Sequence, residues 1–247
     1  MAREKERLDR LLARRGLFAS REQARRAIMA GRVRVEGRLA DKPGTLLPVA
    51  AEVVVVGPPR RYVSRGGEKL EHALDHFAID PAGWICLDAG ASTGGFTDCL
   101  LQRGARRVYA IDVGRGQLDQ GLRQDPRVVV IEGVNARYLE PDALPEPARL
   151  ATVDVSFISL AKLVPALHPL LAPGGLLLPL IKPQFEAGRR EVGKGGVVRD
   201  EAVRTRVIQQ VAADLAAIGF ELRGIVDSPV RGAKGNREAF ACLERPF

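Results

Sequence analysis

Cysteine, histidine and aromatic residues are scarce in this sequence. Its 247 residues include three cysteines, three histidines and one tryptophan, and aromatic residues make up only 5%. Cys86, Cys99 and Cys242 are odd in number and far apart, and no pair has metal-ligand spacing. A disulfide framework and a zinc site are therefore not expected. We predict buried, reduced thiols and no metal.

A long apolar run is also missing. No segment approaches the roughly 20 apolar residues that a membrane span requires. The first residues, Met-Ala-Arg-Glu-Lys-Glu-Arg, are charged and lack the hydrophobic segment of a secretory signal. These two absences disfavour a pore-forming or secreted protein. We expect a cytoplasmic protein without membrane contact.

Positive charge is present, and it is concentrated at one end. The formal net charge is +8. The first 60 residues hold 14 Lys and Arg against 7 Asp and Glu, whereas the remainder is almost neutral. The length is comfortable for two domains. A basic head on a near-neutral body indicates a polyanionic partner that is contacted through the head, although a merely solvated surface is the alternative.

Within the head, short amphipathic patterns predict helices and strands. Leucines at helical spacing predict a first helix that ends at Gly16. Ser20 and Gln23 form a capping box, which predicts the start of a second helix. Alternation over residues 32–35 predicts a strand, and residues 53–56 predict another. The head is thus expected to be a small α+β domain.

Arginines gather on one side of this predicted unit, where they could contact phosphates. The string RLDRLLARRGLFASREQARRAIMAGRVRVEG, residues 7–37, resembles the S4-like RNA-binding domain, which implies an RNA partner but no particular reaction. The candidate RNA-binding residues, one of them just behind the head, are Arg7, Arg21, Arg25, Arg26, Arg32, Arg34 and Arg65.

A break separates the head from the body. Gly57-Pro58-Pro59 interrupts any regular element, and basic and aromatic residues follow. We therefore predict an RNA-binding domain at residues 1–59, a linker at 60–64 and a catalytic domain at 65–247. The linker is interpreted as a spacer or as a further RNA contact.

Strand and helix patterns alternate along the body. Apolar strands separated by helices predict a mostly parallel sheet covered on both faces, which is an α/β, Rossmann-like, doubly wound fold. Two final strands without a helix between them predict an antiparallel hairpin at one edge. The expected strands are 84–88, 108–112, 128–132, 151–155, 176–181, 221–226 and 238–243, and the expected helices are 95–103, 118–124, 159–171 (kinked at Pro165) and 201–218.

The first strand of the body ends in DAGASTGGFTD, residues 88–98. Its glycines let the backbone approach a ligand, and the pattern differs from the G-x-G-x-x-G of dinucleotide enzymes. It resembles the first motif of S-adenosylmethionine enzymes. Acidic and amide side chains after the next two strands fit contacts to ribose and adenine. The candidate cofactor-binding residues are Asp88, Gly90, Ser92, Thr93, Gly94, Gly95, Phe96, Asp112 and Asn135.

Two lysines and two carboxylates lie near the ends of other predicted elements of the body. Asp154 ends the fourth strand, Lys182 follows the fifth, Glu238 lies near the last strand, and Lys69 precedes the first. The motifs of amino-group and pyrimidine carbon-5 methylases are absent. Lys69, Asp154, Lys182 and Glu238 resemble, in type and order, the catalytic tetrad of FtsJ-like RNA ribose 2′-O-methyltransferases. With its head, the chain resembles the TlyA family throughout, most specifically in VSRGGEKL, DAGASTGGFTD, VDVSFISL and LIKPQFEAG. Ser92-Thr93 departs from the Ala-Pro of many members but leaves the glycines intact.

That resemblance implies a class I methyltransferase fold, S-adenosylmethionine as cofactor, and methyl transfer to the 2′-hydroxyl of cytidine in 16S or 23S ribosomal RNA. The implied partner is ribosomal RNA or a ribosomal subunit, with no obligate protein partner. Lys182 is interpreted as the base or as the group that orients the oxygen, and Asp154 and Glu238 as groups that position the ammonium groups. Two alternatives remain: a non-catalytic RNA-binding or ribosome-assembly protein, and, more remotely, a haemolysin.

Overall fold

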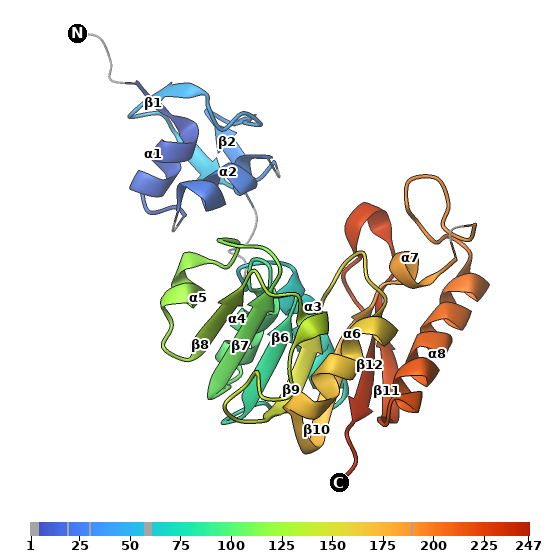
Figure 1. The fold of residues 1–247 in the computed structure, drawn as a ribbon. Coiled ribbons are helices and arrows are strands. Elements are labelled where there is room, and N and C mark those ends of the chain that lie inside the picture. The colour runs from blue at the N-terminus through green and yellow to red at the C-terminus, as the bar shows by residue number, and fades with distance from the viewer. Residues whose placement is uncertain (1–4, 19, 30, 57–60, 189) are drawn as a thin grey trace. The chain divides into compact units, whose positions relative to one another are not determined.

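The computed structural model divides the chain into two compact units, residues 1–59 and residues 60–247. It describes residues 5–18, 20–29, 31–56, 61–188 and 190–247. The predicted domain boundary, at residues 57–60, lies outside the described residues. Figure 1 shows the elements of both units. No helix among the described residues combines the length and the apolar character needed to cross a membrane.

The first unit combines two helices with two small sheets, and its core contains Leu8, Leu12 and Ile28. The capping prediction at Ser20 is confirmed, since its Oγ accepts a hydrogen bond from the Gln23 N–H at 3.2 Å. Three very short strands were not predicted: β1 and β4, which pair antiparallel with each other, and β3, which pairs antiparallel with β2. The elements are β1 (Lys5–Arg7), α1 (Leu8–Arg14), α2 (Arg21–Met29), β2 (Val33–Val35), β3 (Arg38–Leu39), β4 (Leu46–Pro48) and β5 (Val53–Val55).

The second unit is built on a seven-stranded sheet in the order β11-β12-β10-β9-β6-β7-β8. The five strands from β10 to β8 are parallel, and β12 pairs antiparallel with both β10 and β11. This confirms the predicted α/β class and the closing hairpin. The strands are β6 (Ile85–Ala89), β7 (Arg107–Asp112), β8 (Val128–Glu132), β9 (Ala148–Val153), β10 (Leu171–Ile181), β11 (Glu221–Asp227) and β12 (Ala239–Glu244).

Helices cover both faces of this sheet. One apolar core includes buried residues of α3 and α4, and the other includes those of α6 and α8. All three cysteines are buried and free, as predicted. The helices are α3 (Gly66–His76), α4 (Gly95–Gln102), α5 (Gln120–Gln124), α6 (Leu160–Leu167), α7 (Pro183–Glu186) and α8 (Glu201–Ala217), with 3₁₀ turns η1 (Ala136–Tyr138), η2 (His168–Leu170) and η3 (Ala233–Gly235).

Two sequence predictions in this unit were wrong in detail. The helix expected over 159–171 ends at Leu167 and continues as a 3₁₀ turn, and β10 begins at Leu171 rather than at Leu176. Pro165 lies inside α6, where it removes one backbone donor and so shortens the regular helix. The helix α3 was not predicted at all, although its buried Leu70, Ala73 and Leu74 have helical spacing.

Candidate active site

The glycine-rich turn between β6 and α4 lies against the end of β9. Gly90 has a φ of +88°, and a Cβ there would lie 2.5 Å from the main-chain oxygen of Asp154. Gly94 has a φ of +97°, and a Cβ there would lie 2.3 Å from Leu122. Both positions therefore require glycine on conformational and steric grounds. The turn brings bare backbone next to the carboxyl end of β9, where Asp154 follows the strand.

A pocket of about 350 Å³ opens at this edge of the sheet. This volume falls within the usual range for small-molecule sites. Predicted site residues that line it are Arg65, Lys69, Gly90, Ser92, Thr93, Gly95, Phe96, Asp154 and Lys182. Four further lining residues were not predicted: Ser64, Gly66, Ala91 and Ser156. Each of these four lies within one of the motifs already noted, so its position beside a predicted residue was the available signal.

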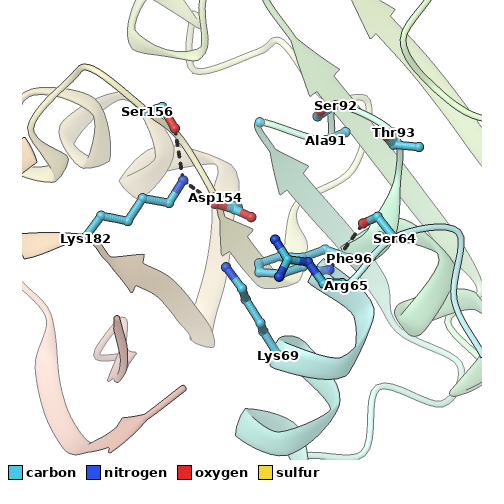
Figure 2. Close-up of a pocket in the computed structure, with 13 residues that line it drawn as sticks. Ser64, Arg65, Lys69, Ala91, Ser92, Thr93, Phe96, Asp154, Ser156 and Lys182 are labelled. Atoms are coloured by element: carbon cyan, nitrogen blue, oxygen red, sulfur yellow. Dashed lines mark hydrogen bonds and ion pairs between the residues drawn. The ribbon is translucent and has the colours of Figure 1, made fainter. Parts of the chain in front are cut away.

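Lys182 and Asp154 form an ion pair on one side of the pocket. Their Nζ and Oδ1 atoms are 2.6 Å apart, and the Lys182 Nζ also donates to the Ser156 Oγ at 3.1 Å. Figure 2 shows the three side chains converging, with Ser92 and Thr93 across the pocket. Lys182 immediately follows β10 and Asp154 immediately follows β9, which are adjacent parallel strands. Their meeting is thus a direct product of the sheet topology.

Lys69 forms the second ion pair, with Glu238. The Lys69 Nζ lies 2.6 Å from the Glu238 Oε2, and both side chains are buried. Lys69 belongs to α3, and Glu238 directly precedes β12. The Glu238 carboxylate also packs closely against Gly232, where a Cβ would lie only 1.9 Å from it, so no larger residue fits there. The four residues of the predicted tetrad are therefore brought together as two lysine–carboxylate pairs, with Glu238 behind Lys69 rather than in the pocket lining.

Asp88 lies beneath the glycine-rich turn and does not line the pocket. It is fully buried and accepts hydrogen bonds from the Thr97 N–H at 2.9 Å, from the Thr97 Oγ at 2.7 Å and from the Thr152 Oγ at 3.3 Å. Burial raises the pKa of Asp88 to about 7 despite these donors. Its contacts fix the start of α4 to β6 and β9.

Asp112 and Asn135 also lie outside the pocket lining. The two carboxylate oxygens of Asp112 accept backbone N–H groups of Ser92 and Gly114, each at 2.7 Å. Asp112 thereby holds the glycine-rich turn against the end of β7. Asn135 is exposed and caps η1 by accepting the Arg137 N–H at 3.1 Å. Their predicted contacts with a cofactor remain predictions.

The residues assigned to the linker contact the second unit. Tyr62 is buried, and a Cβ on Gly67 would lie 2.2 Å from its ring. The Val63 N–H donates to the Asp98 Oδ2 at 2.8 Å, and Ser64 lines the pocket. Residues 62–64 are thus part of the wall behind the candidate active site.

The predicted RNA-binding arginines of the head fall into two groups. Arg7 and Arg21 both form ion pairs with the buried carboxylate of Asp9, at 3.1 and 2.9 Å. Although burial opposes it, hydrogen bonds from these two arginines hold the pKa of Asp9 below its usual value. Arg25, Arg26 and Arg34 are exposed, and Arg32 is half-buried. Arg7 and Arg21 therefore have a structural contact in addition to any contact with RNA.

Comparisons with known proteins agree with this geometry. A mostly parallel seven-stranded sheet with a glycine-lined pocket at its carboxyl edge is the fold of class I methyltransferases. Residues 62–245 match the FtsJ-like methyltransferases and residues 6–53 match the S4 domain. The chain therefore belongs to the FtsJ-like methyltransferase family, in the group that contains TlyA.

The relatives match over nearly the full chain. The chain is 50% identical over 238 residues to the 16S/23S rRNA (cytidine-2′-O)-methyltransferase TlyA of Mycobacterium tuberculosis, covering 96% of this chain and 89% of that protein. It is 49% identical to YqxC of Bacillus subtilis, over 100% of this chain and 88% of that protein. A solved structure from Streptococcus thermophilus is 47% identical, with a TM-score of 0.77 over 99% of this chain and 90% of that one.

Proposed function

We propose that the protein transfers a methyl group from S-adenosylmethionine to the ribose 2′-hydroxyl of cytidine in ribosomal RNA. The observation that carries this proposal is the convergence of the pairs Lys182–Asp154 and Lys69–Glu238 at one pocket beside a glycine-rich turn. The relative TlyA is named for this reaction. The proposed partner is ribosomal RNA or a ribosomal subunit, and the proposed place of action is the cytoplasm.

The pocket suits the proposed cofactor. Gly90 and Gly95 line it, and the absence of a Cβ at these positions lets the turn pack tightly against Asp154 and Ser64, which also line the pocket. The positive end of the α4 dipole and the Arg65 side chain favour a carboxylate at this position. Asp112, just outside the lining, is the proposed ribose contact and Asn135 the proposed adenine contact. When bound, S-adenosylmethionine supplies an electrophilic methyl group.

Lys182 is the proposed contact with the reacting hydroxyl. Asp154 and Ser156 hold its Nζ from one side, which leaves the remaining position of the nitrogen directed at the pocket. From there Lys182 has one of two roles: as an ammonium group it orients the 2′-oxygen by donating a hydrogen bond, or as a neutral amine it accepts the proton that the hydroxyl releases as the oxygen–methyl bond forms and the methyl–sulfur bond breaks. Ser156 was not predicted, and its hydrogen bond to the Nζ makes it a positioning residue for Lys182.

Lys69 supplies a second positive charge at the pocket, and Glu238 fixes its position. Because Glu238 is almost completely buried and its carboxylate is paired only 2.6 Å from the Lys69 Nζ, the ammonium group has little freedom to move. A fixed cation beside the reacting oxygen stabilises the negative charge that develops on it. The pair Lys182–Asp154 thus acts on the reacting hydroxyl, and the pair Lys69–Glu238 stabilises the charge.

The proposal is tested by incubating the protein with deproteinised 16S and 23S ribosomal RNA and methyl-labelled S-adenosylmethionine. We expect label on the 2′-oxygen of cytidine, detected as an alkali-resistant dinucleotide, and its near-complete loss in Lys182→Ala. A methylated base would overturn the assignment of the reaction. Binding of S-adenosylmethionine without transfer to any ribosomal RNA or subunit would favour the non-catalytic alternative.

A further inference from the structure

Two loops of the second unit are connected through the chain to residues of the tetrad. The segment that begins with Lys182 continues through α7 into a loop at residues 190–199. The loop at residues 228–237 ends directly before Glu238. Figure 1 shows both loops, in orange and red, beyond α7. The second loop contacts the tetrad, since a Cβ on Gly232 would lie 1.9 Å from the Glu238 carboxylate, whereas no described residue of either loop lines the pocket itself.

The side chain of Asn236 joins the two loops into one surface. It is buried, its Oδ1 accepts the Val198 N–H at 3.1 Å, and its Nδ2 donates to the Gly196 carbonyl at 2.9 Å. Lys234 has a φ of +57°, which is rare for a residue with a side chain. Its ammonium group lies 3.8 Å from the position that a Cβ on Gly196 would take. The hydrogen bonds of Asn236 thus hold the two loops together, with Lys234 of one loop close to Gly196 of the other.

This double-loop surface (residues 190–199 and 228–237) carries an excess of positive charge. Arg237 pairs with Glu201 and Asp227, and the other exposed cations are Arg190, Lys194, Arg199, Arg231 and Lys234. No ion pair links these five cations to a carboxylate among the described residues. The acidic residues beside them in the chain are already engaged, since Glu191 pairs with Arg206 and Asp200 caps α8. The charge of the surface is therefore available to a ligand.

The opposite end of the sheet shows the contrast. Arg106 and Arg107, at the start of β7, both pair with Glu146, at 2.9 and 3.0 Å. Arg127, before β8, pairs with Asp125 at 2.7 Å. These three exposed arginines are thus paired with neighbouring carboxylates, whereas Arg149 at the same end lies over the Trp84 ring. The five cations of the double-loop surface without such a partner among the described residues belong to the segments that follow Lys182 and precede Glu238.

We propose that the double-loop surface binds the phosphates that flank the target ribose in the RNA substrate. This inference rests on the proposed function, because every internal ribose of an RNA chain has a phosphate on each side. A site that accepts a 2′-hydroxyl must therefore accommodate two nearby negative charges. Arginine forks and lysine ammonium groups are the usual phosphate contacts, and such contacts fix register without reading the base.

The test compares two triple variants of the full chain with equal loss of charge. Lys194→Gln/Arg199→Gln/Lys234→Gln removes cations of the surface, and Arg106→Gln/Arg107→Gln/Arg127→Gln removes three cations from the opposite end. The probes are deproteinised 16S and 23S ribosomal RNA, with affinity measured at several KCl concentrations. For the loop variant we expect roughly tenfold weaker binding. The slope of log affinity against log KCl concentration should become shallower by about 2, because each lost phosphate contact accounts for about 0.7–0.9.

The opposite-end variant should bind within about twofold of the wild type, since its arginines already have carboxylate partners. Binding of S-adenosylmethionine by both variants checks that the second unit is folded. Unchanged RNA affinity in the loop variant, or equal weakening in both variants, would overturn the inference. A loop variant that kept its RNA affinity and lost binding only to an acidic protein would also count against it. Because affinity is the readout, the comparison stands whether the methyl group reaches ribose, base or neither.

Discussion

At the scale of single residues, the two lysines of the site have different surroundings. Lys182 contacts both Asp154 and the Ser156 hydroxyl in the wall of the pocket, whereas Lys69 pairs with a carboxylate that is almost fully buried. The first arrangement leaves a nitrogen that can meet a substrate, and the second holds a charge in place. We therefore propose different roles for the two lysines, which sequence order alone does not separate.

Replacement of Lys182 by arginine tests whether its role is proton acceptance. The variant Lys182→Arg would keep the positive charge and an ion pair with Asp154, but a guanidinium does not lose its proton at neutral pH. We expect Lys182→Arg and Lys182→Ala both to lower kcat by about 10² to 10⁴, the usual contribution of a general base. Single-turnover methyl transfer to ribosomal RNA is the measurement. An arginine variant with more than a tenth of normal kcat would limit Lys182 to orienting the oxygen.

Asp88 predicts a pH dependence of stability. Its pKa is raised from 3.8 to about 7, so between these values the folded state keeps a proton that the unfolded state has released. The free energy of unfolding should therefore fall as pH rises through this window, and the fall should be complete above about pH 7.

The variant Asp88→Asn cannot titrate and should lack this component. Urea unfolding at about pH 5 and about pH 8 should show a difference about 3 kcal/mol smaller in the variant than in the wild type, at about 1.4 kcal/mol per pKa unit. Asp80→Asn, at an exposed position, is the control and should behave like the wild type. Identical pH profiles for wild type and Asp88→Asn would contradict the raised pKa.

At the scale of elements, Asn236 provides a sharp comparison. It uses both ends of its amide, as acceptor and as donor, to join the loops at Val198 and Gly196. In Asn236→Asp the donor is lost and an oxygen faces the Gly196 carbonyl, so the loops should separate. We expect trypsin to cleave faster at Lys194 and Lys234.

The matched control is an Asn→Asp change at Asn135, where the side chain uses only its oxygen, as a hydrogen-bond acceptor. In Asn135→Asp the Oδ1 can still accept the Arg137 N–H, so trypsin sensitivity of the loops should not change. Limited proteolysis followed by mass spectrometry of the fragments is the measurement. Equal cleavage in the two variants would show that Asn236 does not hold the loops together.

Elements with strong periodicity or apolar runs could be predicted, and weak ones could not. Strands β6, β7 and β8 were predicted to within a residue because apolar runs there are bounded by turns. The helix α3 was missed because it begins with Gly66-Gly67, which favours a loop interpretation. Gly67 is required by tertiary packing, because a Cβ at this position would overlap the Tyr62 ring. No local pattern reveals such a contact.

For the site, the sequence predicted which lysines and carboxylates lie together better than how they are paired. Lys182 and Asp154 follow adjacent parallel strands, so their proximity follows from the predicted topology. The pairing of Lys69 with Glu238 joins positions 169 residues apart and depends on the insertion of β12 between β10 and β11. The hydrogen bonds that occupy Asp88 and Asp112 depend on backbone geometry and could not be foreseen.

At the scale of the whole molecule, the two units allow a test of the head. A fragment that begins at Arg61 lacks the head but keeps Tyr62 and Val63, which contact the second unit. We expect it to bind S-adenosylmethionine and to have much lower affinity for ribosomal RNA, measured by filter binding. Unchanged RNA affinity would refute the role of the head.

The start of the fragment should matter. A fragment that begins at Arg65 loses the buried Tyr62 ring, and deletion of a buried aromatic side chain costs about 3 to 5 kcal/mol. Its thermal unfolding midpoint should therefore be clearly lower than that of the longer fragment. Equal midpoints would show that residues 61–64 act as a spacer only.

The position of β12 has a consequence for biosynthesis. This strand, residues 239–244, follows every other strand of its sheet in the sequence, yet it takes a place inside the sheet with neighbours on both sides. Nascent domains fold from the N-terminus as they emerge. A growing chain can therefore assemble its head and most of the sheet of its second unit, but it cannot complete the site until β12 has left the ribosome. A stop codon in place of Ala239 would leave Glu238 without the strand that positions it, so the shortened product should be inactive.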